Sequence, residues 1–323
     1  MRFCVVGAGA IGAYVGARLQ QSGTDIAFIS RGPQLAALRE HGLTVREPDE
    51  TFHLDVRAFE GAAAIDPADV VILAVKAHQV RDAVPAVRAL YGQDTTVVSL
   101  QNGIPWWYTP GHPVAADWEL ATVDPGHEIA RALDVERAIG ALVYFSANIA
   151  KPGVVDHDNG TRMLLGEPRG GTSARGEAIA SAMRAAGFDA DVSEHLRAEM
   201  WSKLLGNVNF NPISALTHAY VREIYENAAV MALVRETMYE TVAVARALGD
   251  APAMTVEERL ALTPLAGDVR TSMLQDAEAG RRMEIAPIVG AVVELGALAG
   301  VPTPATQHVL ALVTLLDRTL AKR

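Results

Sequence analysis

The feature that most constrains the fold of this chain is a glycine-rich turn near its amino terminus. Gly7-Ala8-Gly9-Ala10-Ile11-Gly12 follows a short β-rich run, Phe3–Val6, and a helical pattern then continues to about Gln21. In a G-x-G-x-x-G turn between a strand and a helix, the glycines let the backbone approach a pyrophosphate, which the helix amino terminus binds. We therefore predict a dinucleotide-binding unit whose cofactor contacts are made by residues Gly7, Ala8, Gly9, Ala10, Ile11 and Gly12.

Polar residues also follow two predicted strands further along the chain. Val70–Val75 and Thr96–Leu100 are apolar runs typical of parallel strands covered on both faces, and they end at Lys76 and at Gln101-Asn102-Gly103. Ligands bind beyond the carboxyl ends of strands in an open parallel sheet. We therefore expect Lys76 and Asn102 at the cofactor site.

The second predicted strand indicates which nicotinamide cofactor is bound. It covers Asp25–Ile29 and ends at Ser30-Arg31-Gly32. An acidic residue at this place would bind the ribose hydroxyls of NAD. A guanidinium can instead bind a 2′-phosphate through two hydrogen bonds, so Arg31 favours NADP over NAD.

The pattern changes in the second half of the chain, where only helices are predicted. We expect an α/β fold with two domains: a Rossmann-type doubly wound domain at 1–194 and an all-α domain at 195–323. The predicted helices cover residues 195–210, 213–218, 222–248, 255–262, 269–280, 285–299 and 304–322. Pro212 is expected to break or kink the first of these helices, because proline lacks an N–H and disfavours helix at the preceding residue, Asn211.

One face of the first of these helices is unusually polar. Lys203, Asn207 and Asn211 are spaced at i, i+4 and i+8, which aligns them on one side of a helix. Asparagine is a poor helix former, and a solvated face more often has Glu, Lys or Arg. A simple solvated face remains an alternative, but the pattern favours a row that faces a ligand.

Composition and charge exclude several classes of function. The net charge of −10 argues against a nucleic-acid or anionic-membrane partner, which requires a basic surface. Cys4 is the single cysteine, which excludes internal disulfides and fits a reducing cytoplasm. We predict no membrane span and no metal site, because His112 and His127 lack partners at metal-ligand spacing.

The segment 104–126 is long for a connection, with four prolines and the aromatic run Trp106-Trp107-Tyr108. Connections of this length are usually functional or disordered. Two interpretations stay open: the aromatic residues form a wall of the site, or they mediate dimer contacts. A homodimer through the helical half is a hypothesis, because the sequence does not fix the oligomeric state.

Taken together, these motifs resemble those of the ketopantoate reductase family over essentially the whole chain. The resemblance rests on motifs in matching order and spacing: GAGAIG at 7–12, Ser30-Arg31, Val75-Lys76-Ala77, Gln101-Asn102-Gly103, Lys203 with Asn207 and Asn211-Pro212, Ser272-Met273-Leu274-Gln275-Asp276, and Glu284. It implies a Rossmann-type domain and a helical domain that bind NADPH and a small 2-oxo acid in the cleft between them.

The resemblance also implies a role for each matching residue. Lys203 corresponds to the proton donor, and Glu284 to the glutamate near the cofactor. Asn207, Asn211 and Ser272 correspond to substrate-binding residues. Asn102 corresponds to an asparagine that contacts both cofactor and substrate, and Lys76 to the lysine after the fourth strand.

The expected reaction is the NADPH-dependent reduction of 2-dehydropantoate to pantoate, a step of pantothenate synthesis. A different 2-oxo acid is the first alternative. The further asparagine that ketopantoate-specific members tend to have falls near Val221 here, and the segment 104–126 is longer than the family's usual connection. A non-catalytic NADP-binding sensor is the second. A 3-hydroxyacid or polyol-phosphate dehydrogenase fits the spacing after residue 200 less well.

Overall fold

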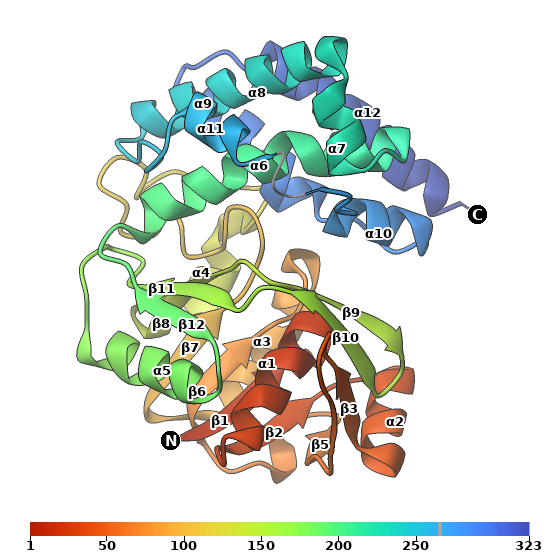
Figure 1. Ribbon diagram of the computed structural model, residues 1–323. Helices are drawn as coiled ribbons and strands as arrows, with labels where there is room; N and C mark the ends of the chain where they lie inside the picture. Colours follow the sequence, from red (N-terminus) through yellow and green to blue (C-terminus); the bar gives the residue numbers. More distant parts are fainter. Residues whose placement is uncertain (264–266, 323) are drawn as a thin grey trace. The chain divides into compact units, whose positions relative to one another are not determined.

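The computed structural model describes residues 1–263 and 267–322, and these form two compact units (Figure 1). The first unit comprises Met1–Gln101 and Glu128–Leu196, and the second comprises Asn102–His127 and Arg197–Arg323. The chain passes from one unit to the other three times, after Gln101, after His127 and after Leu196. Residues 102–127, however, cluster with the helices and not with the sheet.

An eight-stranded sheet forms the centre of the first unit. Its strand order is β12-β11-β8-β7-β6-β1-β2-β5. All neighbouring pairs are parallel except β8 and β11, as expected of a doubly wound fold. The strands are β1 (Arg2–Val6), β2 (Asp25–Ile29), β5 (Ala58–Phe59), β6 (Ala68–Leu73), β7 (Tyr91–Ser99), β8 (Ala138–Val143), β11 (Arg162–Gly166) and β12 (Asp189–Val192).

Helices and a second, smaller sheet complete the first unit. The small sheet has the order β4-β3-β10-β9, and it contains an antiparallel hairpin of β3 (Leu43–Arg46) with β4 (Thr51–Leu54). The other strands are β9 (Ser146–Lys151) and β10 (Val154–Asn159). The helices are α1 (Ala10–Gln21), α2 (Gly32–His41), α3 (Val80–Ala89), α4 (Glu128–Leu133) and α5 (Ala174–Ala185), with single 3₁₀ turns at Ala62–Ala64, Ala77–Gln79 and Val135–Arg137.

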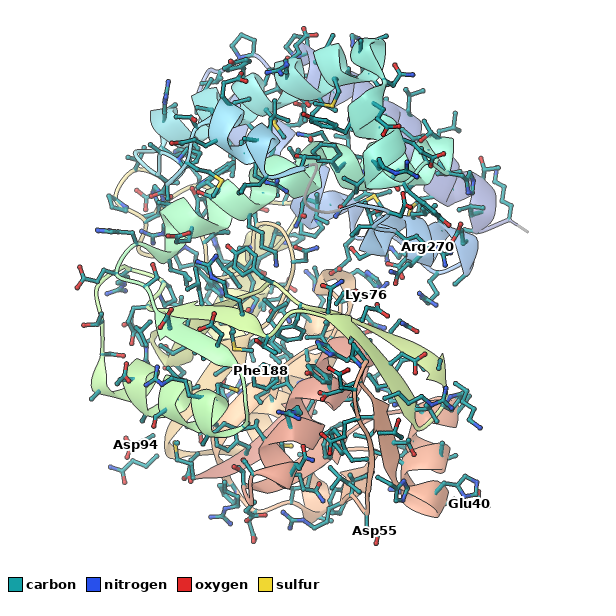
Figure 2. All side chains as sticks on the ribbon, in the orientation of Figure 1. Glu40, Asp55, Lys76, Asp94, Phe188 and Arg270 are labelled. Carbon is teal, nitrogen blue, oxygen red and sulfur yellow. The ribbon has the colours of Figure 1, made fainter. Side chains whose placement is uncertain are left out.

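Aromatic rings fill the space between α1 and its neighbours in the first unit. The Tyr14 ring stacks on His157 at 4.3 Å and meets the edges of Phe145 and Phe188 at 5.5 and 5.7 Å. Figure 2 shows Phe188 in the interior, whereas Glu40 lies at the surface. The hydroxyl of Tyr14 donates to Glu47 at 2.9 Å, so the ring is buried while its polar group stays bonded.

The second unit is helical apart from the segment 102–127. An apolar cluster that includes Leu205, Phe210, Met238 and Leu260 packs its helices together. The elements are a 3₁₀ turn at Pro125–His127, α6 (Leu196–Thr217), α7 (Val221–Glu226), α8 (Ala228–Ala247), α9 (Val256–Ala261), α10 (Ser272–Glu278), a π-helical turn η6 (Ala286–Gly290), α11 (Ala291–Leu298) and α12 (Pro304–Leu320). None of the helices in the described ranges is long and apolar enough to cross a membrane.

Two of the predicted helix boundaries are wrong. Helix α6 continues without interruption through Pro212 to Thr217, so the expected break is absent. Proline removes one N–H and one helical hydrogen bond, and the buried packing of Phe210 and Ile213 on either side stabilises the helix enough to continue. The predicted helix 222–248 is in fact two helices, because Asn227 caps α8 by accepting from Val230 N–H at 3.1 Å.

Buried hydrogen bonds fix the segment 102–127 to the helices of the second unit. The Tyr108 hydroxyl donates to Asp250 at 2.8 Å and accepts from Trp201 Nε1 at 3.1 Å. His112 Nδ1 accepts two backbone N–H groups at 3.0 Å, so its proton resides on Nε2, which donates to Asp250 at 2.9 Å. The Tyr108 ring is 0% exposed. It is therefore part of the core of the second unit and not an exposed dimer contact.

Candidate functional site

The glycine turn has the geometry that phosphate binding requires. Gly7 has φ +102°, and a side chain there would lie 2.6 Å from Val75 Cγ1. A side chain on Gly12 would collide with the Gly7 carbonyl oxygen. Gly9, the N-cap of α1, has no atom within 4 Å of the place where a Cβ would be. The turn is therefore closed on the protein side and open beside the first N–H groups of α1, which have no partner within the helix.

A side chain that sequence reasoning missed supports this turn. Gln34 of α2 donates from Nε2 to the Ala8 carbonyl at 3.0 Å and accepts from Gly153 N–H at 3.0 Å through Oε1. Gly7 and Ala8 also donate their N–H groups to the Ile29 carbonyl, at 3.0 and 3.3 Å. The partners of Gln34 are 26 and 119 residues away, so spacing alone gave no signal for it.

Arg31 and Lys76 lie beyond the carboxyl ends of neighbouring strands, as predicted. β1 pairs with β2 on one side and with β6 on the other, so the glycine turn, Arg31 and Lys76 follow three adjacent strands. Arg31 is exposed at the N-cap of α2. Lys76, labelled in Figure 2, follows the end of β6 and is partly buried. These residues, with the open turn at Gly9, fit the phosphates and the adenosine end of a dinucleotide.

In the second unit, the predicted polar row lies on one unbroken helix. Lys203, Asn207 and Asn211 are all in α6, so the spacing of four residues aligns them as expected. Lys203 and Asn207 are partly buried, and Asn211 is 6% exposed. A solvated face would leave all three exposed, so the row is not one.

The environment of Lys203 changes its acidity. Burial lowers the pKa of the Lys203 amine from 10.5 to about 8, while the charge of Glu284 acts in the opposite direction and raises it. A solvent-exposed lysine would keep a pKa of about 10.4. At neutral pH the amine is still mainly protonated, and its pKa is close enough to neutrality for efficient proton transfer.

Asn102 is hydrogen-bonded to the α6 row. Asn207 Nδ2 donates to Asn102 Oδ1 at 2.8 Å, and Gly103 N–H donates to the same oxygen at 3.1 Å. Both bonds occupy the oxygen of Asn102, so its Nδ2 is the group that it can offer to a ligand. The structure thus brings together Asn102, Asn207, Lys203 and Glu284 within one compact unit.

Ser272 stands apart from this group. Thr271, and not Ser272, caps α10, because the Thr271 hydroxyl accepts from Leu274 N–H at 3.1 Å. Ser272 is exposed at the first position of the helix, and in the described ranges no hydrogen bond joins it to the α6 row. Ser272 therefore does not cap α10, and its hydroxyl remains accessible. Also within those ranges, no group of three or more His, Cys, Asp or Glu residues could hold a metal ion.

Comparison with known proteins identifies the family. The profile "Ketopantoate reductase PanE/ApbA" matches residues 3–170, and its companion "Ketopantoate reductase PanE/ApbA C terminal" matches residues 195–317. The chain belongs to the ketopantoate reductase family. A 2-dehydropantoate 2-reductase of Mesorhizobium japonicum is 41% identical over 97% of both chains, and one of Archaeoglobus fulgidus is 29% identical over 97% of this chain and 96% of its own.

Solved structures of ketopantoate reductases have the same fold. A candidate ketopantoate reductase of Ralstonia solanacearum is 39% identical and matches with a TM-score of 0.94 over 99% of this chain and 98% of its own. The 2-dehydropantoate 2-reductase of Geobacter metallireducens is 31% identical, with a TM-score of 0.86 over 98% and 99%. D-mandelate dehydrogenase with NADH and anilino(oxo)acetate is 23% identical, with a TM-score of 0.85 over 99% of each chain, which shows a shared fold.

Proposed function

We propose that this ketopantoate reductase family member reduces 2-dehydropantoate to pantoate with NADPH. The observation that supports this most directly is the pairing of Lys203 with Glu284 next to the hydrogen-bonded pair Asn102 and Asn207. Like its relatives, the enzyme is an oxidoreductase that uses a nicotinamide cofactor. The finer choice of NADPH rests on Arg31, an exposed guanidinium that follows β2 where an NAD enzyme has a carboxylate.

In this proposal, the residues of α6 act on the carbonyl of the substrate. The nicotinamide cofactor supplies the hydride when it is bound. Lys203 donates a proton to the carbonyl oxygen, and its positive charge stabilises the alkoxide as it develops. Glu284 holds the ammonium in place and raises its pKa. Asn102 Nδ2, Asn207, Asn211 and the Ser272 hydroxyl orient the 2-oxo acid.

A different 2-oxo acid is the second candidate substrate. Val221 stands near the position at which the family's ketopantoate-specific members have an asparagine, and here it is 7% exposed within the apolar cluster of the second unit. This position therefore gives the substrate no amide. A sensor without catalytic activity is less well supported, because binding alone does not require a partly buried lysine with a pKa near 8 beside a glutamate.

The decisive experiment is a panel of 2-oxo acids with NADPH oxidation as the readout. We expect 2-dehydropantoate to give the highest kcat/KM, and a preference for a bulkier or smaller acid would favour the second candidate.

The Lys203→Ala variant should lower kcat about 100-fold or more while its NADPH affinity, measured by titration, stays unchanged. Near-normal kcat in this variant would refute the proton-donor role. A cytoplasmic location and a homodimer remain predictions.

A further inference from the structure

The segment that bears Glu284 is held from two sides within the second unit. On one side, Met283 N–H donates to Asp317 Oδ1 of α12 at 3.0 Å. On the other side, the Pro287 carbonyl accepts from Ile104 N–H at 2.8 Å, two residues after Asn102. Glu284 thus lies between two fixed points, and one of them is continuous with the turn that positions Asn102.

The π-helical turn makes the second contact available. In an α-helix the Pro287 carbonyl would accept from Ala291 N–H, four residues later. Here Ala291 N–H donates to Ala286, five residues back. The Pro287 carbonyl therefore bonds across to Ile104. Gly103 has φ +79°, and a side chain there would lie 2.6 Å from the Pro287 carbonyl carbon, so the two segments are in direct contact. Turns of this kind recur at functional sites because they redirect backbone groups.

We propose that Asp317 is a positioning residue, which fixes Glu284 beside Lys203 by accepting the N–H of Met283. This inference rests on the proposed function, since it assigns to Asp317 an effect on the proton donor of that reaction. Asp317 itself is 33 residues from Glu284 in the sequence and comes from the last helix. A carboxylate oxygen that accepts a backbone N–H makes a charge-assisted bond, which is stronger than a neutral one.

Other charged groups near this segment have different roles. Arg281 is exposed and pairs with Asp276 Oδ1 at 2.9 Å, and Arg282 is exposed. Glu199 lies one turn before Lys203 on α6 and is partly buried. Among these groups, Glu284 is the one whose charge raises the pKa of Lys203. Displacing Glu284 would therefore lower that pKa, and the protonated, active form would be lost at lower pH.

The test compares Asp317→Ala with Asp317→Asn by kinetics over a range of pH. In the wild type, kcat/KM for reduction should fall as pH rises through about 8, because Lys203 loses its proton. In Asp317→Ala we expect kcat to fall roughly 10- to 100-fold. The alkaline fall of kcat/KM, which we call the basic limb of the pH profile, should move to lower pH by about one unit. Asp317→Asn keeps an oxygen acceptor for the Met283 N–H, so it should restore most of the rate and the position of the limb.

Controls separate this inference from a general loss of stability and from the proposed function. Asp268→Ala removes an exposed carboxylate of the same unit, which is bonded to Arg222, and should leave the pH profile unchanged. If Asp317→Ala does not fold, Asp317→Glu provides the same comparison, because it keeps the charge but moves the acceptor. An unshifted limb with normal kcat in Asp317→Ala, or equal losses in Ala and Asn variants, overturns the role of Asp317. A wild type inactive on every 2-oxo acid overturns the proposed function and this role with it.

Discussion

At the scale of single residues, burial and charge give Lys203 its chemistry. The same amine on an exposed helix would have a pKa near 10.5 and would be a poor proton donor at neutral pH. Burial on α6 lowers that value to about 8, and Glu284 prevents it from falling further. Reductase activity is therefore expected to depend on Lys203 and on Glu284, 81 positions later, whose charge opposes the effect of burial on the pKa of the amine.

Arg31 gives a prediction about cofactor choice. Arg31→Ala should weaken NADPH binding by about 10-fold or more, because charge-assisted hydrogen bonds contribute on the order of 1.5–3 kcal/mol. NADH lacks the 2′-phosphate, so its affinity should change by less than about threefold. Fluorescence titration of both cofactors on wild type and variant provides the measurement. Equal weakening of the two would show that Arg31 does not contact the 2′-phosphate.

The residue types at the candidate site could be read from the sequence, but their supporting partners could not. Motifs are local, so Gly7, Gly9, Gly12 and Lys203 are recognisable from neighbours within a few positions. Gln34 and Asp317 act through backbone groups of remote segments, and a backbone N–H has no signature in a sequence. The lowered pKa of Lys203 likewise depends on packing that no spacing reveals.

At the scale of elements, α6 connects the candidate site to the core of the second unit. One face presents Lys203 and Asn207, and another bonds Trp201 to Tyr108 of the segment 102–127. The helix continues through Pro212 because the apolar side chains around it outweigh one lost hydrogen bond. Local propensity predicted the helix and its faces correctly, but it failed where tertiary packing opposes it.

Tyr108→Phe should destabilise the protein more than a comparable exposed change. Removing the hydroxyl leaves Trp201 Nε1 without its acceptor and takes one donor from Asp250, both in a buried setting. We expect a loss of roughly 1–3 kcal/mol in the free energy of unfolding. Tyr239→Phe removes a hydroxyl that also donates to a carboxylate, that of Glu257 at 3.0 Å, but the ring is 54% exposed.

Denaturant titration of both variants makes the comparison. The exposed variant should lose no more than about 0.5 kcal/mol. Similar losses in the two variants would mean that the Tyr108 hydroxyl does not contribute as a buried group. If Tyr108→Phe also changes kcat, the hydrogen bond between Tyr108 and Trp201 of α6 helps to position Lys203 on the same helix.

At the scale of the whole molecule, the two compact units are not consecutive stretches of chain. Residues 102–127 belong to the second unit although 128–196 return to the first. A boundary at one position in the sequence cannot describe this arrangement. The segment 102–127 lies between the first two passages of the chain and has no periodicity, so its membership of the second unit can be found only from its contacts.

A fragment of residues 195–323 should therefore fold poorly alone. It lacks the Tyr108 hydroxyl bonded to Trp201 and Asp250, and the N–H groups of Ala121 and Thr122 that Glu294 binds at 2.8 and 2.9 Å. We expect thermal unfolding by circular dichroism to show a weak, broad transition. Adding a peptide of residues 102–127 should sharpen the transition, and a scrambled peptide should not. A sharp transition without the peptide would show that the helices are self-sufficient.

The interleaved order of the units also has a consequence during synthesis on the ribosome. The aromatic stretch at 106–108 emerges long before Trp201 and Asp250, the residues that Tyr108 joins in the finished protein. At about 5–20 residues per second, making the intervening chain takes on the order of several seconds. During that interval two tryptophans and a tyrosine of the nascent polypeptide lack the helices that later bury them. We therefore expect this stretch to be a binding site for a chaperone.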